Sequence, residues 1–447
     1  MEQLSRIYFI GIGGIGMSAL ARYFHGKGLF VSGYDRTETE LTRNLQQEGM
    51  TICFEDDVAL LDKDADLVVY TPAIPADHQQ LNYYRDHGYQ LKKRSQVLGE
   101  LTHDHFTIAV AGSHGKTTTS SMIAWILRDS GYDCTAFLGG ICVNFESNFV
   151  QGANQVIVVE ADEFDRSFHT LHPDIAVVTA IDSDHLEIYG TQEALEENFL
   201  VFAKQIHDNG LLIHKQQVTA LQAHTGRRST YSLRDDAADL YAVSTEIEEH
   251  GSRVILSNGF DFVLEYPGIH NIENAIAATC VALELGISEE AVRKALRSFR
   301  GIHRRFEVVW KQDRRVLIDD YAHHPEEIRM FINSLRAIYP GKQVEVVFQP
   351  HLYTRTRDLA TDFAGALDLA DHVVLLPIYP ARELPIPGID ANTIARHMKG
   401  SVRLLESTQL QEFVQDDEHQ VIAMVGAGNI DQLVRPMASW LEKKYSR

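Results

Sequence analysis

The stretch AVAGSHGKTTTS at residues 109–120 ends an apolar run, passes through a glycine loop and enters an amphipathic segment. A strand, such a loop and a helix form the repeating unit of parallel α/β sheets. The loop offers backbone N–H groups, a lysine and hydroxyls, which are the groups that hold nucleotide phosphates and Mg²⁺. Because Val110 replaces the first glycine of the common G-x-x-x-x-G-K-[ST] pattern, we predict a shortened phosphate loop that binds ATP. A plain glycine turn with an exposed lysine is the alternative.

Short β-branched runs alternate with longer amphipathic segments along the rest of the chain, which is typical of parallel sheets with crossover helices. The strands that we predict lie at residues 6–10, 29–35, 67–72, 106–112, 155–162, 174–181, 344–350, 372–379 and 421–428. The turn-separated runs at 240–266 predict a small antiparallel insert. At roughly 150 residues per domain, a chain of 447 residues predicts about three domains.

A second glycine loop follows the predicted strand at 6–10. Its G-x-G-x-x-G pattern enters a helix, and the next strand ends in Asp35 about 20 residues later. Backbone N–H groups at such a helix start can approach a diphosphate. The pattern alone favours NAD and an oxidoreductase, and a tight turn without a ligand is the alternative. We predict a phosphate-bearing ligand at four glycines: Gly11, Gly13, Gly14 and Gly16.

Acidic residues follow two further predicted strands. Glu160 stands near the end of the strand at 155–162, at the edge where open α/β sheets bind ligands. The next strand runs into Asp182, Asp184 and His185. The aspartates could simply cap the following helix, and the histidine could be a hydrogen-bonded loop residue. Beside a phosphate loop, however, Glu160 and His185 are candidate ligands of Mg²⁺.

The overall charge limits the classes of partner. There are 62 acidic and 41 basic residues, and the net charge of -21 argues against nucleic acid as a partner. The four cysteines have no spacing that would hold a structural zinc, which predicts reduced thiols. The apolar run near residue 10 lacks a basic flank and is broken by glycines, so we expect no membrane insertion and a cytoplasmic protein.

Eight stretches spread over almost the whole chain resemble, in order and approximate spacing, the motifs of the Mur ligases of peptidoglycan synthesis. They are GIGGIGMSALA, AGSHGKTTTS, EADEFDRSF, DSDHLEIYG, GIHNIENAIAA, RRFE, DDYAHHPEEI and FQPHLYTRTRDL. The resemblance implies an α/β fold of three domains, which are a UDP-sugar-binding Rossmann-like domain, a central P-loop ATPase-like domain and an amino-acid-binding Rossmann-like domain. We place the boundaries near residue 102, after the predicted helical stretch SQVLGELT, and near residue 309, after RRFEVV, which gives domains at 1–102, 103–309 and 310–447. For the assembly we expect a monomer or a homodimer, and the sequence does not choose between them.

The resemblance further implies an ATP-dependent ligase that joins L-alanine to the lactyl carboxylate of UDP-N-acetylmuramate through an acyl phosphate. ADP and phosphate would be the other products. The implied catalytic residues are Lys116, His185 and Arg305. The implied ligands of Mg²⁺ are Thr117, Glu160 and His185. The glycines of the first loop, with Asp35, would then hold a UDP-sugar rather than NAD.

Two further groups of residues are assigned by the same resemblance. The implied ATP-binding residues are Gly112, Ser113, His114, Gly115, Lys116, Thr117, Thr118, Asn271, Asn274, Arg305 and Asp320. The implied amino-acid-binding residues are Tyr321, His323, His351 and Arg355. For the two asparagines, a helix cap followed by a surface side chain is the alternative. The HH pair at 323–324 has no third ligand at a spacing that would complete a zinc site.

The chain departs from the family pattern at two positions. Leu352 stands where many such sequences have an arginine, so we expect Arg355, with His351, to hold the alanine carboxylate. Asn198 stands where several relatives carry a carbamylated lysine near a second metal.

Three rival functions stay open: a murein peptide ligase that adds a tripeptide, an NAD-dependent oxidoreductase and a non-catalytic nucleotide-binding protein. We also expect Lys116→Ala to leave stability nearly unchanged, since an exposed loop lysine adds little to it.

Overall fold

The computed structural model describes residues 4–182, 189–248, 251–313, 315–381, 383–416 and 419–446. The chain divides into two compact units. The first consists of Met1–Ser244, Val254–Val263 and Ile272–Arg300, and the second of Thr245–Arg253, Leu264–Asn271 and Gly301–Arg447.

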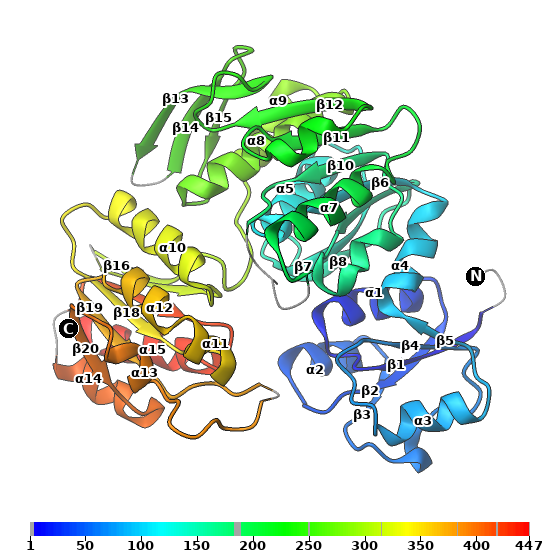
Figure 1. The fold of residues 1–447 in the computed structure, drawn as a ribbon, viewed down its shortest axis with the longest axis horizontal. Helices are drawn as coiled ribbons and strands as arrows, with labels where there is room; N and C mark the ends of the chain where they lie inside the picture. The colour runs from blue at the N-terminus through cyan, green and yellow to red at the C-terminus, as the bar shows by residue number, and fades with distance from the viewer. Residues whose placement is uncertain are drawn as a thin grey trace. The chain divides into compact units, whose positions relative to one another are not determined.

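The first unit begins with a five-stranded sheet whose strand order is β3-β2-β1-β4-β5, with all neighbours parallel (Figure 1). Its central strand is the apolar run RIYFI, of which four residues are fully buried, as expected for a parallel strand covered on both faces. The strands are β1 (Arg6–Ile10), β2 (Phe30–Tyr34), β3 (Thr51–Cys53), β4 (Leu67–Tyr70) and β5 (Leu91–Lys93). The helices are α1 (Ile15–Gly26), α2 (Glu40–Gln47), α3 (Gln79–Asp86) and α4 (Arg94–His103), with a 3-10 turn η1 (Val58–Leu60).

A second sheet of ten strands follows, in the order β15-β14-β13-β12-β11-β10-β6-β9-β7-β8. Its middle strands pair in parallel, and β8 closes one edge antiparallel to β7. The strands are β6 (Phe106–Ala111), β7 (Thr135–Cys142), β8 (Ser147–Val150), β9 (Val156–Glu160), β10 (Ile175–Val178), β11 (Leu211–Lys215), β12 (Arg227–Ser232), β13 (Leu240–Glu248), β14 (Gly251–Leu256) and β15 (Asp261–Leu264). The helical elements are α5 (Lys116–Asp129), η2 (Phe164–Thr170), α7 (Gln192–Ala203), η3 (Thr219–Ala223), α8 (Ile269–Glu284) and α9 (Glu289–Arg297).

The second unit holds a six-stranded sheet in the order β16-β17-β21-β18-β19-β20. Only its edge strand β16 runs antiparallel to its neighbour. The strands are β16 (Glu307–Gln312), β17 (Arg315–Asp320), β18 (Val344–Phe348), β19 (His372–Leu375), β20 (Ser401–Leu404) and β21 (Val421–Val425). The helical elements are α10 (Pro325–Ile338), α11 (Tyr353–Asp358), α12 (Ala360–Leu367), α13 (Asn392–Ala395), η4 (Ser407–Gln409), α14 (Leu410–Asp416) and α15 (Asp431–Tyr445).

The predicted fold class is confirmed, and each predicted apolar run contains a strand. The insert predicted at 240–266 is found as β13, β14 and β15, which are neighbours at one end of the ten-stranded sheet. Position 102 falls in the last turn of α4, and position 309 falls within β16.

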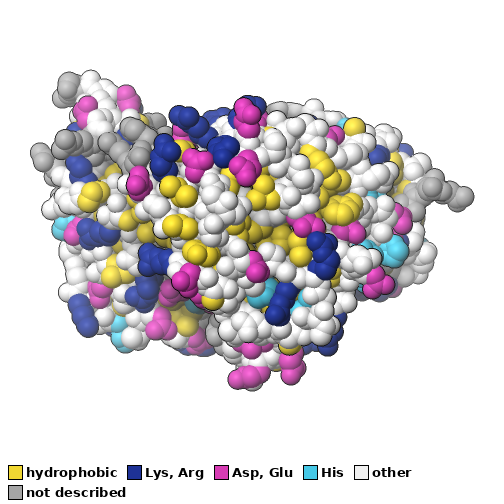
Figure 2. Space-filling view, turned by 90° about the horizontal axis from the view of Figure 1, so that it is seen from above, with side chains coloured by type: hydrophobic (Ala, Val, Ile, Leu, Met, Phe, Trp, Pro, Cys, Tyr) yellow, Lys and Arg dark blue, Asp and Glu magenta, His cyan; other side chains and the backbone are white. Residues whose placement is uncertain are grey.

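Charged side chains of both signs are scattered over the face shown in Figure 2. On the face shown in Figure 2, the coloured Lys and Arg side chains are interspersed with Asp and Glu side chains. Among the helices of the described residues, none combines the length and the apolar character needed to cross a bilayer.

Candidate functional site

The loop between β6 and α5 has the geometry of a phosphate loop. It leaves the sheet at Gly112 and enters the helix at Gly115, whose φ of 80° is the left-handed conformation that glycine adopts without strain. A side chain at Gly115 would also lie 2.6 Å from Oδ1 of Asn274. The loop therefore packs directly against Asn274 of α8, the helix that carries both predicted adenine-binding asparagines.

Lys116 is held in place by a backbone carbonyl and a carboxylate. Its Nζ donates to the carbonyl of Gly112 at 2.7 Å and lies 2.8 Å from Oε2 of Glu163, a side chain that is 1% exposed. Burial lowers the pKa of Lys116, but the carboxylates of Glu163, Asp162 and Glu160 outweigh this effect, so the net shift is upward. The lysine is thus charged. The premise that it is an exposed loop residue is wrong, because its side chain is only 13% exposed and is paired.

The hydroxyl of Thr117 donates to Oε2 of Glu160 at 2.7 Å. Glu160 ends β9, which is the neighbour of β6 in the sheet, so the first residues of α5 and the end of β9 meet at one edge. Gly139 of β7 leaves room for this carboxylate, because a Cβ there would lie 2.1 Å from it. A hydroxyl and a carboxylate side by side are hard oxygen donors that suit Mg²⁺. The third predicted ligand, His185, lies outside the described residues.

Ser113 and His114 of the loop contact Asp182, in the segment after β10. The hydroxyl of Ser113 donates to the carbonyl of Asp182 at 3.1 Å and accepts from its N–H at 2.9 Å. His114 lies 3.6 Å from the Asp182 carboxylate. Thr118 is buried in the first turn of α5.

Asn271, one turn before Asn274 on α8, and Asn198 each hydrogen-bond a backbone carbonyl four residues earlier in the chain. Asn271 is buried and donates from its side chain to the carbonyl of Pro267, one turn earlier. The side-chain Nδ2 of Asn198 donates to the carbonyl of Ala194 at 2.7 Å, within α7.

The N-terminal glycine loop is closed by Asp35. One carboxylate oxygen accepts the N–H of Gly13 at 2.8 Å, and the other accepts the N–H of Thr37 at 3.1 Å. Gly11 turns back with its N–H 2.7 Å from the carbonyl of Tyr34. Asp35 thus stabilises the loop itself. In a dinucleotide site, the same carboxylate would instead accept hydrogen bonds from a ribose.

In the second unit, Asp320 organises the turns on either side of it. Its two oxygens accept the N–H groups of Phe306 and Ala322 at 2.7 and 2.8 Å. Burial raises the pKa of Asp320 to about 6, against the opposing effect of Arg305. The Arg305 guanidinium lies over the ring of Tyr321, with 5.3 Å from Cζ to the ring centroid. The structure therefore brings Arg305, Asp320 and Tyr321 together.

His323 and His351 lie beside this cluster, with ring centroids 6.1 Å apart. Burial, together with His323 and Arg355, lowers the pKa of His351 to about 4, so its ring is neutral at pH 7. Nδ1 of His351 and Nη1 of Arg355 are buried and lack a hydrogen-bond partner among the described residues. A buried guanidinium nitrogen without a hydrogen-bond partner favours a carboxylate ligand.

A loop after β19 contacts His351 and the start of α11. The ring of Tyr379 stacks on His351 at 5.7 Å, and its carbonyl accepts the N–H of Leu352 at 3.0 Å. Glu383 accepts the N–H of Thr354 at 3.0 Å, in the first turn of α11, which carries Arg355. Leu352 itself has a φ of 70°, which is strained for a leucine.

Four of the contacting residues were not predicted as site residues. Glu163 lies within the EADEFDRSF stretch, and Arg304 lies next to Arg305 in RRFE. Their positions within these motifs are the sequence signal by which both could have been found. Arg304 donates from Nη2 to the carbonyl of Gly426 at 2.6 Å, after β21. Tyr379 stands at the end of the predicted strand at 372–379 and Glu383 in the loop after it, and neither position belongs to a functional motif that the sequence displays.

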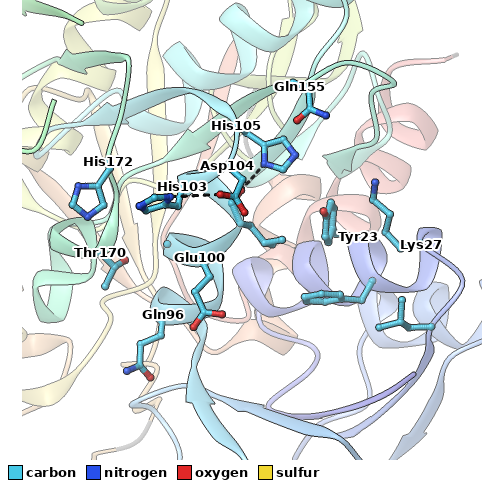
Figure 3. Close-up of a pocket in the computed structure, with 14 residues that line it drawn as sticks. Tyr23, Lys27, Gln96, Glu100, His103, Asp104, His105, Gln155, Thr170 and His172 are labelled. Atoms are coloured by element: carbon cyan, nitrogen blue, oxygen red, sulfur yellow. Dashed lines mark hydrogen bonds and ion pairs between the residues drawn. The ribbon is translucent and has the colours of Figure 1, made fainter. Parts of the chain in front are cut away.

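A separate hollow of about 880 Å³ lies in the first unit, between the end of α1 and α4 (Figure 3). Histidines line part of it, and the rings of His103 and His172 are 6.0 Å apart. None of its lining residues belongs to the predicted sites. They are Tyr23, Phe24, Lys27, Leu29, Gln96, Gly99, Glu100, Leu101, His103, Asp104, His105, Gln155, Thr170 and His172.

Comparison with known families matches three consecutive parts of the chain. Residues 6–106 match the domain described as Mur ligase family, catalytic domain. Residues 110–282 match the Mur ligase middle domain, and residues 304–430 match the Mur ligase, glutamate ligase domain.

Individual relatives cover the full length. A UDP-N-acetylmuramate--L-alanine ligase of Parabacteroides distasonis is 46% identical, with 99% of each chain covered. The structure of UDP-N-acetylmuramate-alanine ligase MurC from Thermotoga maritima is similar with a TM-score of 0.85 at 28% identity, covering 99% of this chain and 100% of that chain. A murein peptide ligase from Psychrobacter arcticus shares the fold, with a TM-score of 0.72 at 24% identity and 98% of each chain covered.

Proposed function

Because the chain belongs to the Mur ligase family, we propose that it is an ATP-dependent ligase that joins L-alanine to the lactyl carboxylate of UDP-N-acetylmuramate in peptidoglycan precursor synthesis. The observation that carries this proposal is the arrangement at the end of β6 and β9, where Lys116 and Thr117 face two acidic side chains. The full-length similarity to alanine ligases supports the choice of substrates.

The first unit would hold ATP. Backbone N–H groups from Gly112 to Thr117 would surround the phosphates, and Lys116 would neutralise their charge. Thr117 and Glu160 would hold Mg²⁺, which when bound supplies positive charge beside the phosphates. The N-terminal glycine loop would hold the diphosphate of the sugar nucleotide through backbone N–H groups, since Asp35 is engaged in closing that loop.

The chemistry follows from the poor reactivity of a carboxylate. An amine cannot displace one of its oxygens until that oxygen becomes a leaving group. Transfer of the γ-phosphoryl group from ATP to the lactyl carboxylate gives an acyl phosphate and ADP. The alanine amine then attacks the acyl carbon, the C–O bond to phosphate breaks, and the amine loses its proton as the amide forms.

The second unit would present alanine. The buried Nη1 of Arg355 would donate to the alanine carboxylate, and neutral His351 would add a hydrogen bond. Arg305 would stabilise charge on the transferring phosphoryl group. Both oxygens of Asp320 already accept backbone N–H groups, so a nucleotide contact by this residue requires an additional hydrogen bond to the same carboxylate.

The domain boundaries 1–102, 103–309 and 310–447, a cytoplasmic location and a monomeric or homodimeric state belong to the same proposal. Nucleotide-linked substrates support the location. The family matches, which end at 106 and 282 and resume at 304, support three domains of about this extent.

Phosphate release tests the proposal and separates its rivals. With ATP, Mg²⁺ and UDP-N-acetylmuramate present, the chain is incubated with alanine, serine, glycine or a murein tripeptide. We expect release with alanine above the other additions. Phosphate release with the tripeptide but with none of the amino acids would identify a murein peptide ligase. ATP binding without phosphate release would identify a non-catalytic protein. A fluorescence change on adding NADH, without phosphate release, would favour the oxidoreductase.

A further inference from the structure

A buried polar contact joins the helix of the glycine loop to the sheet of the phosphate loop. Asn148 lies on β8 and is 0% exposed. Its side-chain Nδ2 donates to the carbonyl of Ile15 at 2.5 Å and to Oγ of Ser18 at 2.9 Å. That hydroxyl in turn donates to the carbonyl of Ile15 at 2.9 Å. The contact therefore fixes the first turn of α1, directly after the glycine loop.

The amide oxygen of Asn148 also accepts a hydrogen bond. Oδ1 of Asn148 accepts from Nη1 of Arg22, one turn further along α1. Arg22 is itself held by Glu48: its Nε donates to both carboxylate oxygens, at 3.0 and 2.9 Å, and its Nη2 donates to Oε1 at 2.7 Å. Both the amide N–H₂ group and the amide oxygen of Asn148 have partners on α1. The side chain can therefore make all these hydrogen bonds at only one position of α1 along its axis.

Apolar packing already holds α1 against β7 and β8 without this polar contact. Tyr23 of α1 already packs against Phe137 and Phe149, with ring centroids 5.6 and 6.3 Å apart, and one continuous apolar core includes residues of both sheets. A fully satisfied buried polar group adds a defined register to an interface that apolar packing already holds together.

The strand that carries Asn148 leads to the phosphate site. β8 pairs with β7, and β7 pairs with β9, which ends in Glu160. Gly139 of β7 lies against that carboxylate. We propose that Asn148 is a positioning residue: it sets the register of α1 against β8, and so aligns the sugar nucleotide at the glycine loop with the phosphate loop. This inference rests on the proposed function of both loops.

A residue that aligns two ligands acts on the step that joins them. We expect Asn148→Ala to lower kcat for ligation by about 10–100-fold, because small misplacements of reacting groups have effects of that size. The dissociation constants for UDP-N-acetylmuramate and for ADP, each measured alone by calorimetry, should stay within about threefold of wild type. Asn148→Asp should behave similarly, since it keeps the acceptor for Arg22 but loses both donated hydrogen bonds.

Gln151→Ala is the matched control, because Gln151 is exposed and lies beside Gly26 at the other end of α1. Its kcat should stay within about twofold of wild type. Ser18→Ala, which keeps the direct bond from Asn148 to Ile15, is the variant to use if both Asn148 variants fail to fold. We expect a smaller fall in kcat from it, with unchanged dissociation constants.

Hydrogen exchange gives a readout that does not depend on the reaction. Backbone amides of residues 16–20 should exchange at least about tenfold faster in Asn148→Ala than in Gln151→Ala. A folded Asn148→Ala with wild-type kcat and wild-type exchange would overturn the inference, as would a loss confined to sugar-nucleotide affinity. If wild type releases no phosphate in the same assay, the proposed function fails, whereas the exchange result still decides whether Asn148 fixes α1.

Discussion

The ammonium of Lys116 forms a buried ion pair with Glu163, at 2.8 Å from Oε2, in the loop where ATP phosphates would lie. The lysine side chain is 13% exposed and the glutamate 1%. Each charge is tolerated in this place because the other is present.

Loss of the lysine alone should therefore destabilise the protein as well as inactivate it. We expect Lys116→Ala to lower the free energy of unfolding by about 3–5 kcal/mol, because a buried carboxylate loses its partner. Turnover should fall by about 100-fold or more, because charge stabilisation on the phosphates is lost. Urea unfolding and phosphate release measure the two effects.

The double variant Lys116→Met with Glu163→Gln separates these effects. It removes both charges, so most of the lost stability should return, while turnover should stay about 100-fold or more below that of wild type. If Lys116→Ala is as stable as wild type, the buried pair contributes nothing, and if the double variant is active, Lys116 does not act on the phosphates.

Arg355→Ala should impair the use of alanine selectively. A charge-assisted hydrogen bond contributes roughly 1.5–3 kcal/mol, so the Michaelis constant for alanine should rise by about 10–100-fold, with those for ATP and the sugar nucleotide nearly unchanged. Arg357→Ala is the matched control, because Arg357 lies on the same helix but pairs with its exposed neighbour Asp358. An unchanged alanine constant with another substrate impaired would place Arg355 at a different part of the site.

Glu160→Gln should raise the Mg²⁺ concentration needed for half-maximal activity by about tenfold or more, since a neutral amide is a weaker ligand than a carboxylate. The control is Glu100→Gln, which removes a surface carboxylate paired with Lys92. An Mg²⁺ titration of phosphate release measures the shift. Identical titration curves for wild type and Glu160→Gln would remove Glu160 from the metal site.

His351 should make stability sensitive to acid. Its pKa is lowered to about 4 in the folded protein, so between that value and its ordinary value of 6.5 only the unfolded chain takes up the proton. The wild type should therefore lose stability as pH falls through this window, and His351→Asn should lose less. Urea unfolding at pH 7 and pH 4.5 tests the difference. Equal losses in the two proteins would mean that His351 is not buried as a neutral ring.

Much of the fold could be predicted because its central strands are continuous apolar runs. RIYFI of β1 and VIVVE of β9 are buried on both faces, which the sequence displays directly. The short edge strands β5, with the sequence LKK, and β20, with SVRL, were not predicted because they are only partly buried and carry no such run.

The candidate site could be predicted where one short motif contains it. The loop at 112–117 is an example, and its contact with Glu160 follows from the neighbouring strands β6 and β9. The pairing of Lys116 with Glu163 could not be predicted, since it depends on how the chain turns after β9. Likewise, the support of His351 by Tyr379 joins residues 28 positions apart, with α11, α12 and β19 between them.

The acyl phosphate is the central claim, and transfer of oxygen tests it most directly. UDP-N-acetylmuramate is labelled with a heavy oxygen isotope in its lactyl carboxylate and is converted with ATP and alanine. Mass spectrometry of the products then follows the label. If the carboxylate is phosphorylated and phosphate leaves on attack by alanine, each released phosphate carries a single labelled oxygen and the nucleotide product is ADP. Label in AMP, or phosphate without label, would contradict the account.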